Sequence, residues 1–292
     1  RGERPLRILV GADLDRASEA ARAFASKLAM LGSTDIEVLL VASPDKAHER
    51  LGIESPAEDG TLVPEAEAIL LRELSLSAPN NESSASLRVL SAHGGADAHL
   101  VARCDQGNFD LLVVGQRNRS IAQLVRRGSI MRGVLRASPV SVASVPIPIG
   151  ETDLSVRHPH VVVVGMQLTD SDHRALRHAV AYAEAGASVH LVHVVEATRT
   201  DADLRDARDE AWYQLSKAAH ETNDGSFSIE PHVVVGQPAE QLLTVAGRVG
   251  ADLLVLGARR RPFVSRSLLG SVTQALVQDA PIPLLIVPAR RP

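Results

Sequence analysis

The chain has 292 residues and a net charge of −4, a length that exceeds the usual single domain and predicts two domains of about 145 residues each. Aromatic residues make up only 2% of the chain, so little is available to stack on bases, and together with the acidic charge this argues against a nucleic-acid partner. No run approaches the roughly 20 apolar residues of a membrane span. The single cysteine excludes an internal disulfide and fits a reducing cytosol, so we expect a cytoplasmic chain.

Strands and helices are predicted to alternate along the first half. The expected strands are residues 7–13, 36–42, 86–91, 110–115 and 140–145. The expected helices are residues 16–31, 64–76, 97–105 and 129–136. This alternation is typical of right-handed βαβ units and of a parallel sheet that is covered on both faces.

The second half repeats this order after a polar linker. Its expected strands are residues 161–165, 189–195, 228–235, 253–257 and 282–287. Its expected helices are residues 170–185, 201–220, 239–249 and 271–279. We therefore predict a first domain over residues 1–149, a linker over 150–158 and a second domain over 159–292. Trp212 and Tyr213 are expected to pack beneath the long helix of the second half.

An internal repeat supports this division. A constant offset of 142 residues relates Gly115 to Gly257, Gly128 to Gly270, and Pro139 to Pro281. Nearer the start of each half the offset is 154, so the first copy carries extra residues, which we place between residues 47 and 80. Two copies of one fold are the simplest explanation. Prolines bracket the last strand of each copy, which predicts edge strands that could pair with each other or with another chain.

A strand that ends in glycine is followed in each copy by a Gly-Ser pair at the expected start of a helix. These residues are Gly115 with Gly128 and Ser129, and Gly257 with Gly270 and Ser271. Glycine allows close approach of a ligand, and the N–H groups at a helix start bind phosphate oxygens. The alternative is that Gly-Ser only caps the helix. The layout therefore predicts a phosphate site and leaves a purely structural role open.

Arginines surround both predicted phosphate positions. They are Arg117, Arg119, Arg126, Arg127, Arg259, Arg260, Arg261 and Arg266. The guanidinium group suits phosphate geometry, although exposed loop arginines are also common without a ligand. If they act, a ligand with more than one phosphate is expected, and a cyclic dinucleotide is as compatible as ATP.

The segment from Gly257 to Val272 resembles the nucleotide loop of universal stress proteins, in which Gly, two residues, Gly, nine residues and Gly precede Ser or Thr. With the repeat, the resemblance covers nearly the whole chain and points to a tandem member. It implies an α/β fold of two open parallel five-stranded sheets in the order 3-2-1-4-5, with helices on both faces and a pseudo-twofold relation. It also implies ATP as a ligand, with Mg²⁺ if ATP is bound, and regulation rather than catalysis, with slow ATP hydrolysis left open. The implied nucleotide-binding residues are Asp13, Ser43, Gly115, Asn118, Gly128, Ser129, Ile130, Val194, Gly257, Gly270, Ser271 and Val272.

Each copy departs from the family pattern. The second glycine of the loop is replaced by Asn118 in copy one and by Arg260 in copy two. Asparagine tolerates positive φ better than arginine does. The aspartate expected after the first strand is Asp13 in copy one, but Gln167 stands there in copy two. After the second strand, where the family contacts adenine, Val194 of copy two is more typical than Ser43 of copy one. Each copy therefore breaks the pattern somewhere, and we favour copy one as the nucleotide site.

The histidines that we considered show no zinc-binding spacing. His190 and His193 are three apart on a strand, which turns them to opposite faces, and His173 and His178 diverge on a helix. We read these four, with His158 and His160 of the linker region, as structural or surface groups and expect no metal site.

Three interpretations of function remain open at this point. The first is a stress or regulatory module that binds an adenine nucleotide and changes its partners or its homodimer. The second is an interaction module in which neither site binds nucleotide. The third, which the absence of an initiator Met permits, is the cytosolic regulatory part of a larger protein such as an ion transporter.

Overall fold

The computed structural model describes residues 4–12, 16–42, 83–91, 95–116, 130–147, 158–169, 172–197, 200–258 and 270–289. The chain divides into two compact units, Arg1–Val156 (unit 1) and Arg157–Pro292 (unit 2). Each unit has its own parallel sheet and its own buried core.

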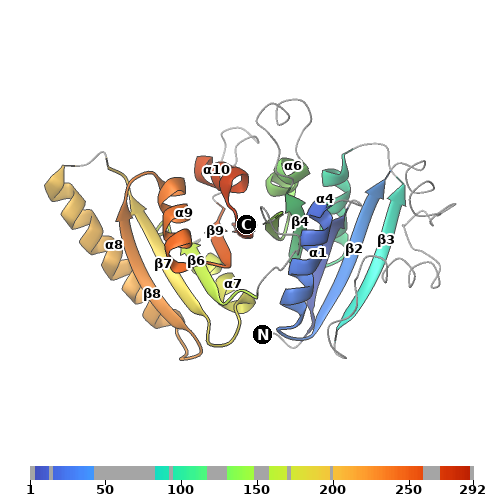
Figure 1. The fold of residues 1–292 in the computed structure, drawn as a ribbon, viewed down its shortest axis with the longest axis horizontal. Coiled ribbons are helices and arrows are strands. Elements are labelled where there is room, and N and C mark those ends of the chain that lie inside the picture. Colours follow the sequence, from blue (N-terminus) through green and yellow to red (C-terminus); the bar gives the residue numbers. More distant parts are fainter. Residues whose placement is uncertain are drawn as a thin grey trace. The chain divides into compact units, whose positions relative to one another are not determined.

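The described part of unit 1 forms a five-stranded sheet, and along the chain a helix follows the first, the third and the fourth strand (Figure 1). Its elements are β1 (Leu6–Ala12), α1 (Arg16–Ala29), β2 (Thr34–Ala42), β3 (Ser84–Ser91), α4 (Ala96–Gln106), β4 (Leu111–Gln116), α6 (Ile130–Ala137) and β5 (Ser141–Pro146). The strands lie in the order β3-β2-β1-β4-β5, and all neighbouring pairs are parallel.

Unit 2 repeats this arrangement. Its elements are β6 (Val161–Gly165), α7 (Asp172–Tyr182), β7 (Ser188–Val195), α8 (Asp201–Thr222), β8 (Ser228–Val235), α9 (Pro238–Val249), β9 (Leu253–Gly257), α10 (Ser271–Asp279) and β10 (Leu284–Val287). The order is β10-β9-β6-β7-β8, again parallel throughout. In order of sequence both sheets read 3-2-1-4-5, which confirms the predicted α/β fold with two tandem domains.

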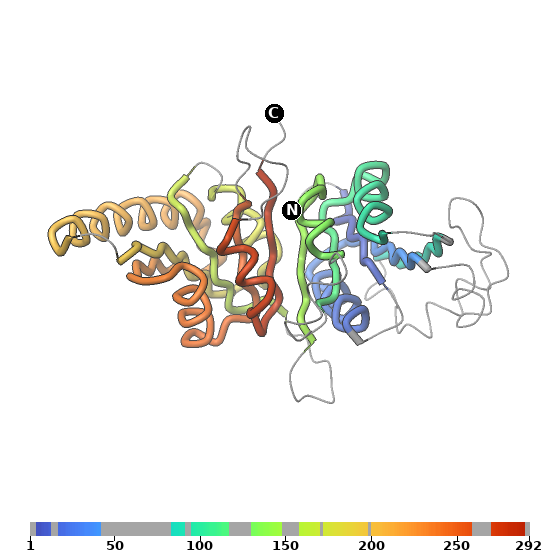
Figure 2. The backbone as a smooth tube through the Cα atoms, turned by 90° about the horizontal axis from the view of Figure 1, so that it is seen from above, coloured from blue at the N-terminus to red at the C-terminus, as the bar shows by residue number. Residues whose placement is uncertain are grey.

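The central strands are apolar on both faces because helices cover both. In unit 1, α1 packs on β1, β4 and β5, while α4 packs on α6 and β2. In unit 2, α7 and α8 pack together, and α9 packs on α10, β6 and β7. Figure 2 shows α1 and α4 on opposite sides of the first sheet, and α8 and α9 on opposite sides of the second. The cores consist almost entirely of Ala, Val, Leu and Ile, as the low aromatic content predicts.

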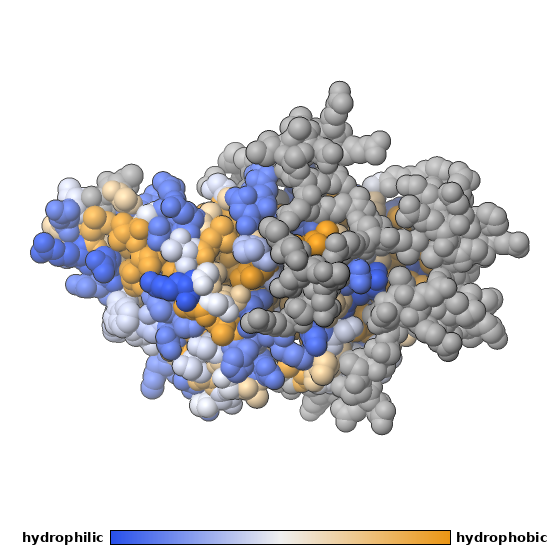
Figure 3. Space-filling model, in the orientation of Figure 1, coloured by the Kyte–Doolittle hydropathy of each residue, from blue (hydrophilic) through white to orange (hydrophobic). Residues whose placement is uncertain are grey.

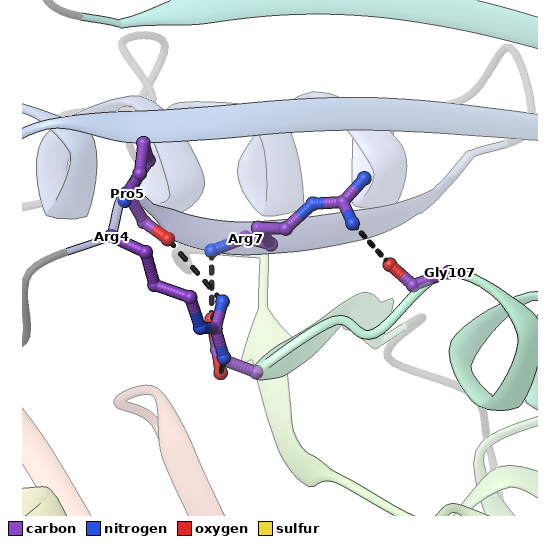
Figure 4. A network of polar contacts seen from close by, with 5 residues as sticks. Arg4, Pro5, Arg7 and Gly107 are labelled. Carbon is purple, nitrogen blue, oxygen red and sulfur yellow. Dashed lines mark hydrogen bonds and ion pairs between the residues drawn. The ribbon is translucent and has the colours of Figure 1, made fainter.

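An aspartate just before the fourth strand of each unit fixes the start of the first strand. In unit 1 the Asp110 carboxylate accepts a hydrogen bond from the Arg7 backbone N–H at 2.9 Å and two more from the Arg4 guanidinium (Figure 4). In unit 2 the Asp252 carboxylate accepts from the backbone N–H groups of His160 and Val161, at 3.2 and 3.0 Å. The Asp that opens each repeated Asp-Leu-Leu-Val segment therefore has a structural role.

Helix α8 corrects the expectation for Trp212 and Tyr213. The two residues are 53% and 63% exposed, whereas the buried stripe of the helix is formed by small and aliphatic residues. That stripe consists of Ala211, Leu215, Ala218 and Ala219. The aromatic pair lies off this stripe at helical spacing and faces outward.

On the face shown in Figure 3, hydrophilic residues of unit 2 surround smaller hydrophobic areas.

Most predicted elements in the described ranges occur within two or three residues of their expected ends. The largest difference is at the helix expected over residues 170–185, which the structure has as α7 over Asp172–Tyr182. The helix expected over residues 64–76 lies outside the described residues. None of the described helices is long and apolar enough to cross a membrane.

Candidate functional site

Each sheet reverses its strand order between its first and fourth strands. The second strand lies on one side of the first, and the fourth strand lies on the other. In unit 1 this switch point lies between β1 and β4, where Gly11 is in register with Val114. In unit 2 it lies between β6 and β9, where Gly165 is in register with Leu256. Ligands of open parallel sheets bind beyond the carboxyl ends of the strands at such a point.

Gly115, the last residue but one of β4, lies against the first turn of α1. A Cβ atom added at Gly115 would lie 1.9 Å from the backbone oxygen of Ala17, which is far inside van der Waals contact. The missing side chain is therefore required for the packing of α1 on β4. Because the contacting atoms of Ala17 are backbone atoms, they cannot rotate away from a new side chain. A ligand is not needed to explain this glycine.

The first turn of α10 presents a helix N-terminus to solvent. Gly270 is its N-cap, and Gly270 and Ser271 are exposed, while Val272 is half-buried. No acidic residue lies in this turn, and no side chain caps it. The first N–H groups of any helix lack partners within the helix, and they carry the positive end of its dipole. This end of α10 therefore suits an anion. In unit 1, the corresponding α6 begins at Ile130, a residue that is 40% exposed.

The loop after β6 is held by a buried carboxylate. Asp172, 2% exposed at the start of α7, accepts hydrogen bonds from the backbone N–H groups of Gln167 and Thr169, both at 2.8 Å. Leu168 between them adopts a φ of +60°, which is rare for a residue with a Cβ. Two backbone donors at the mouth of the unit 2 switch point are thus already used within the protein.

The end of β7 also reaches this edge of unit 2. Val194 is half-buried there and is in register with Val234 of β8. The neighbouring His193 lies with its Nδ1 atom 2.9 Å from the backbone oxygen of Met166, which directly follows β6. His193 therefore fixes the chain as it leaves β6, in line with the structural role expected for it.

The structure thus places part of the predicted site. Gly257 is the last residue of β9 and Val194 the last but one of β7, the two strands on either side of β6. Gly270 caps α10, which begins with Ser271 and Val272. Gly115 is the last residue but one of β4, and Ile130 is the first residue of α6. The remaining predicted residues, Asp13, Ser43, Asn118, Gly128 and Ser129, and the loop arginines lie outside the described residues. Sequence reasoning missed Asp172, although an acidic residue near a predicted helix start was a signal for a capping role.

The sequence of this chain matches a family of known proteins. The model of the universal stress protein family matches residues 6–146 and residues 159–288, one region in each unit. Universal stress protein G of Shigella flexneri is 30% identical over 138 residues, which cover 44% of this chain and 94% of that protein. A universal stress protein of Mycolicibacterium smegmatis is 35% identical over 130 residues, which cover 44% of this chain and 96% of that protein.

Solved structures match the fold over nearly the whole chain. A universal stress protein from Archaeoglobus fulgidus DSM 4304 covers 97% of this chain with 98% of its own, at a TM-score of 0.61 and 20% identity. A protein of Pseudomonas aeruginosa UCBPP-PA14, described as a universal stress protein, covers 97% of this chain with 92% of its own, at a TM-score of 0.64 and 14% identity. At these identities the structures support the fold alone.

The fold and the switch-point layout define a tandem α/β protein of the universal stress class. With the family model matched in both halves, this chain belongs to the universal stress protein family.

Proposed function

We propose that this chain is a regulatory nucleotide-binding protein that takes ATP or another adenine nucleotide at the switch point of unit 1. The observation that carries the proposal is the layout of strand, glycine, loop and helix start, which the chain repeats at the same place in both sheets. In the described part of unit 2, the helix start has no acidic residue and is exposed. Its chemistry fits an anion such as a phosphate group.

The loop after the first strand supports unit 1 over unit 2. In unit 2, the Asp172 carboxylate accepts hydrogen bonds from the backbone N–H groups of Gln167 and Thr169, so these groups are not free to donate to a ligand. The residue equivalent to Asp172 at the offset of 154 is Ser18, which is buried and neutral. Unit 1 also carries Asp13 where unit 2 has Gln167, and the family resemblance assigns that position to the adenine or ribose end of the nucleotide.

The proposed residues for unit 1 are Asp13 and Ser43 near the base and sugar, and Gly115, Asn118, Gly128, Ser129 and Ile130 near the phosphates. In unit 2 the corresponding set is Val194, Gly257, Gly270, Ser271 and Val272. Mg²⁺ would accompany ATP by neutralising its phosphate charge. A cyclic dinucleotide is the alternative ligand that the arginine-rich loops favour.

Regulation without substantial catalysis is part of the proposal. The sequence has no phosphate loop of the Gly-x-x-x-x-Gly-Lys-Ser/Thr type and no nucleophile elbow. A bound nucleotide would act by favouring one conformation, and with it one partner or one oligomeric state.

The direct test is to denature the freshly purified chain and to search the supernatant for released nucleotide by mass spectrometry. We expect an adenine nucleotide in an amount approaching one per chain. The same protein, incubated with ATP or cyclic dinucleotides after removal of its ligand, should unfold at a higher temperature. Absence of both a released nucleotide and a thermal shift would contradict the proposal.

A further inference from the structure

Two histidines of unit 2 face each other across neighbouring strands. His190 of β7 and His232 of β8 lie with Nδ1 of the first 2.9 Å from Nε2 of the second. Their ring centroids are 5.1 Å apart. Glu230, in register with His190, lies on the same face of β8 as His232, with its Oε2 atom 3.7 Å from the His190 Nδ1 atom. One nitrogen or oxygen from each of the three side chains lies within 4.8 Å of the other two.

From this geometry we propose that His190, His232 and Glu230 form a binding site for a divalent transition metal of the Zn²⁺ type. The inference is independent of nucleotide binding, because the site is built at the β7–β8 edge rather than at the switch point. Imidazole nitrogen with one carboxylate suits Zn²⁺ and its first-row neighbours rather than Mg²⁺ or Ca²⁺, which prefer oxygen.

The separation of the two nitrogens is close to what a metal requires. Zn–N bonds are about 2.0–2.1 Å, so two nitrogens on a tetrahedral ion lie about 3.3 Å apart. The pair would therefore open by only a few tenths of an ångström when a metal replaces the shared proton. Three protein ligands leave a fourth position for water or an external ligand, on the side where Glu230 is 55% exposed.

The other ring nitrogen of His190 has the partner that a metal-bound histidine needs. Its Nε2 atom lies 3.2 Å from the hydroxyl oxygen of Ser188, two residues earlier on the same strand. An Nε2–H that donates to this oxygen leaves the Nδ1 lone pair free to face the metal. His190 itself is buried, with its side chain 8% exposed, so the ring is held in place by packing.

Unit 1 offers an internal comparison at the same place in its sheet. The strand registers make Glu37 equivalent to His190 and Arg88 equivalent to His232. There Glu37 pairs with Arg88 at 3.3 Å and with Arg103 of α4 at 2.6 Å. That arrangement neutralises its own charge and places two cations where a metal would bind. Unit 2 instead places two neutral bases and a carboxylate at these positions.

One cation opposes the proposed site. Burial lowers the pKa values of His190 and His232, and the positive charge of Arg248, in the last turn of α9, adds a smaller lowering to both. The carboxylate of Glu230 acts in the opposite direction. A metal ion is itself a cation, so removal of the Arg248 charge should strengthen its binding. Removal of the Glu230 charge should weaken binding, because this carboxylate is one of the three proposed ligands.

The test is calorimetric titration of Zn²⁺ into the full chain after treatment with a chelator, with no histidine tag present. We expect one Zn²⁺ per chain. His190→Gln and His232→Gln should each weaken binding by more than about 100-fold, and Ser188→Ala by about 10-fold. Glu230→Gln changes only an exposed side chain, so it should fold normally and bind more weakly. Arg248→Gln should bind more tightly.

The matched control is His160→Gln. His160 also lies near a carboxylate of unit 2, with its Nδ1 atom 3.6 Å from Glu184 Oε2, but that pair is exposed, and among the described residues it belongs to no group of three potential metal ligands. This variant should bind Zn²⁺ as the natural sequence does, and Co²⁺ in place of Zn²⁺ should give the visible absorption of a nitrogen-bound ion. Failure of the natural sequence to bind Zn²⁺, or unchanged affinity in both His190→Gln and Glu230→Gln, would overturn the proposal.

Discussion

Gly115 shows how a single missing side chain decides the packing of α1 on β4. The nearest atoms to a new Cβ would be backbone atoms of Ala17, at 1.9 and 2.2 Å. Gly247 in α9 is the opposite case, because a Cβ there would meet nothing within 4 Å. The same chemical change should therefore have opposite effects at the two positions.

We predict that Gly115→Ala lowers the free energy of unfolding by about 1–3 kcal/mol, because it overpacks a backbone contact. Gly247→Ala should raise that free energy by about 0.5–1 kcal/mol, because alanine is favoured over glycine inside a helix. Urea unfolding followed by circular dichroism measures both changes. Equal stability of the two variants would show that the close approach of Ala17 to Gly115 is not rigid.

Asp252 is a second residue whose role comes from its position before a strand. Its carboxylate satisfies two backbone N–H groups at the start of β6. We predict that Asp252→Ala destabilises unit 2 by about 1–3 kcal/mol, because these donors lose their partner. Asp206→Ala, on the exposed surface of α8, should change stability by less than about 0.5 kcal/mol. Thermal unfolding of the two variants compares them, and a larger loss in Asp206→Ala would contradict the assigned role.

At the scale of single elements, α4 buries the only cysteine. Burial raises the pKa of the Cys104 thiol to about 12, against an ordinary value of 9.0, and the nearby Arg103 opposes this shift only in part. Only the thiolate reacts with alkylating reagents. The folded chain should therefore react with iodoacetamide at pH 8 far more slowly than the same chain in denaturant.

The rate of that reaction should rise with pH only as the pH approaches the raised pKa. Mass spectrometry of the alkylated chain at a series of pH values measures it. Rapid alkylation of the folded protein at pH 8 would mean that the region around α4 opens readily.

Elements dominated by one pattern could be predicted from the sequence. Runs of Val and Leu between turn residues placed the central strands, and apolar residues at helical spacing placed α8. Trp212 and Tyr213 could not be placed by composition, because apolar character alone does not say which side of a helix faces the sheet. The role of Asp172 depends on backbone N–H groups of a loop, which no side-chain pattern reports.

Contacts that depend on strand register also could not be predicted from the sequence. His190 and His232 are far apart in the sequence, and they meet because β7 and β8 pair with Val192 opposite His232. The spacing of His190 and His193 correctly separates those two side chains, but it gives no information about a partner on the next strand. A metal site whose ligands come from two neighbouring strands therefore cannot be predicted until the register of those strands is known.

At the scale of the whole molecule, two copies of one fold have diverged at equivalent positions. The β2–β3 position of unit 1 carries an ion network, and the β7–β8 position of unit 2 carries two histidines. The loop after the first strand of unit 2 holds a buried carboxylate, where unit 1 has Ser18. This divergence favours a division of roles, with the nucleotide in unit 1 and the metal in unit 2.

The central claim is that unit 1 holds the nucleotide, and calorimetric titration of ATP with Mg²⁺ into the full chain and two matched variants tests it most directly. Asp13→Ala removes the family aspartate of unit 1, and Gln167→Ala changes the equivalent residue of unit 2. We predict one ATP per chain, binding weakened at least about 10-fold by Asp13→Ala, which corresponds to about 1.4 kcal/mol, and binding unchanged by Gln167→Ala. Loss of binding in Gln167→Ala alone, or no ATP binding by the natural sequence, would contradict the account.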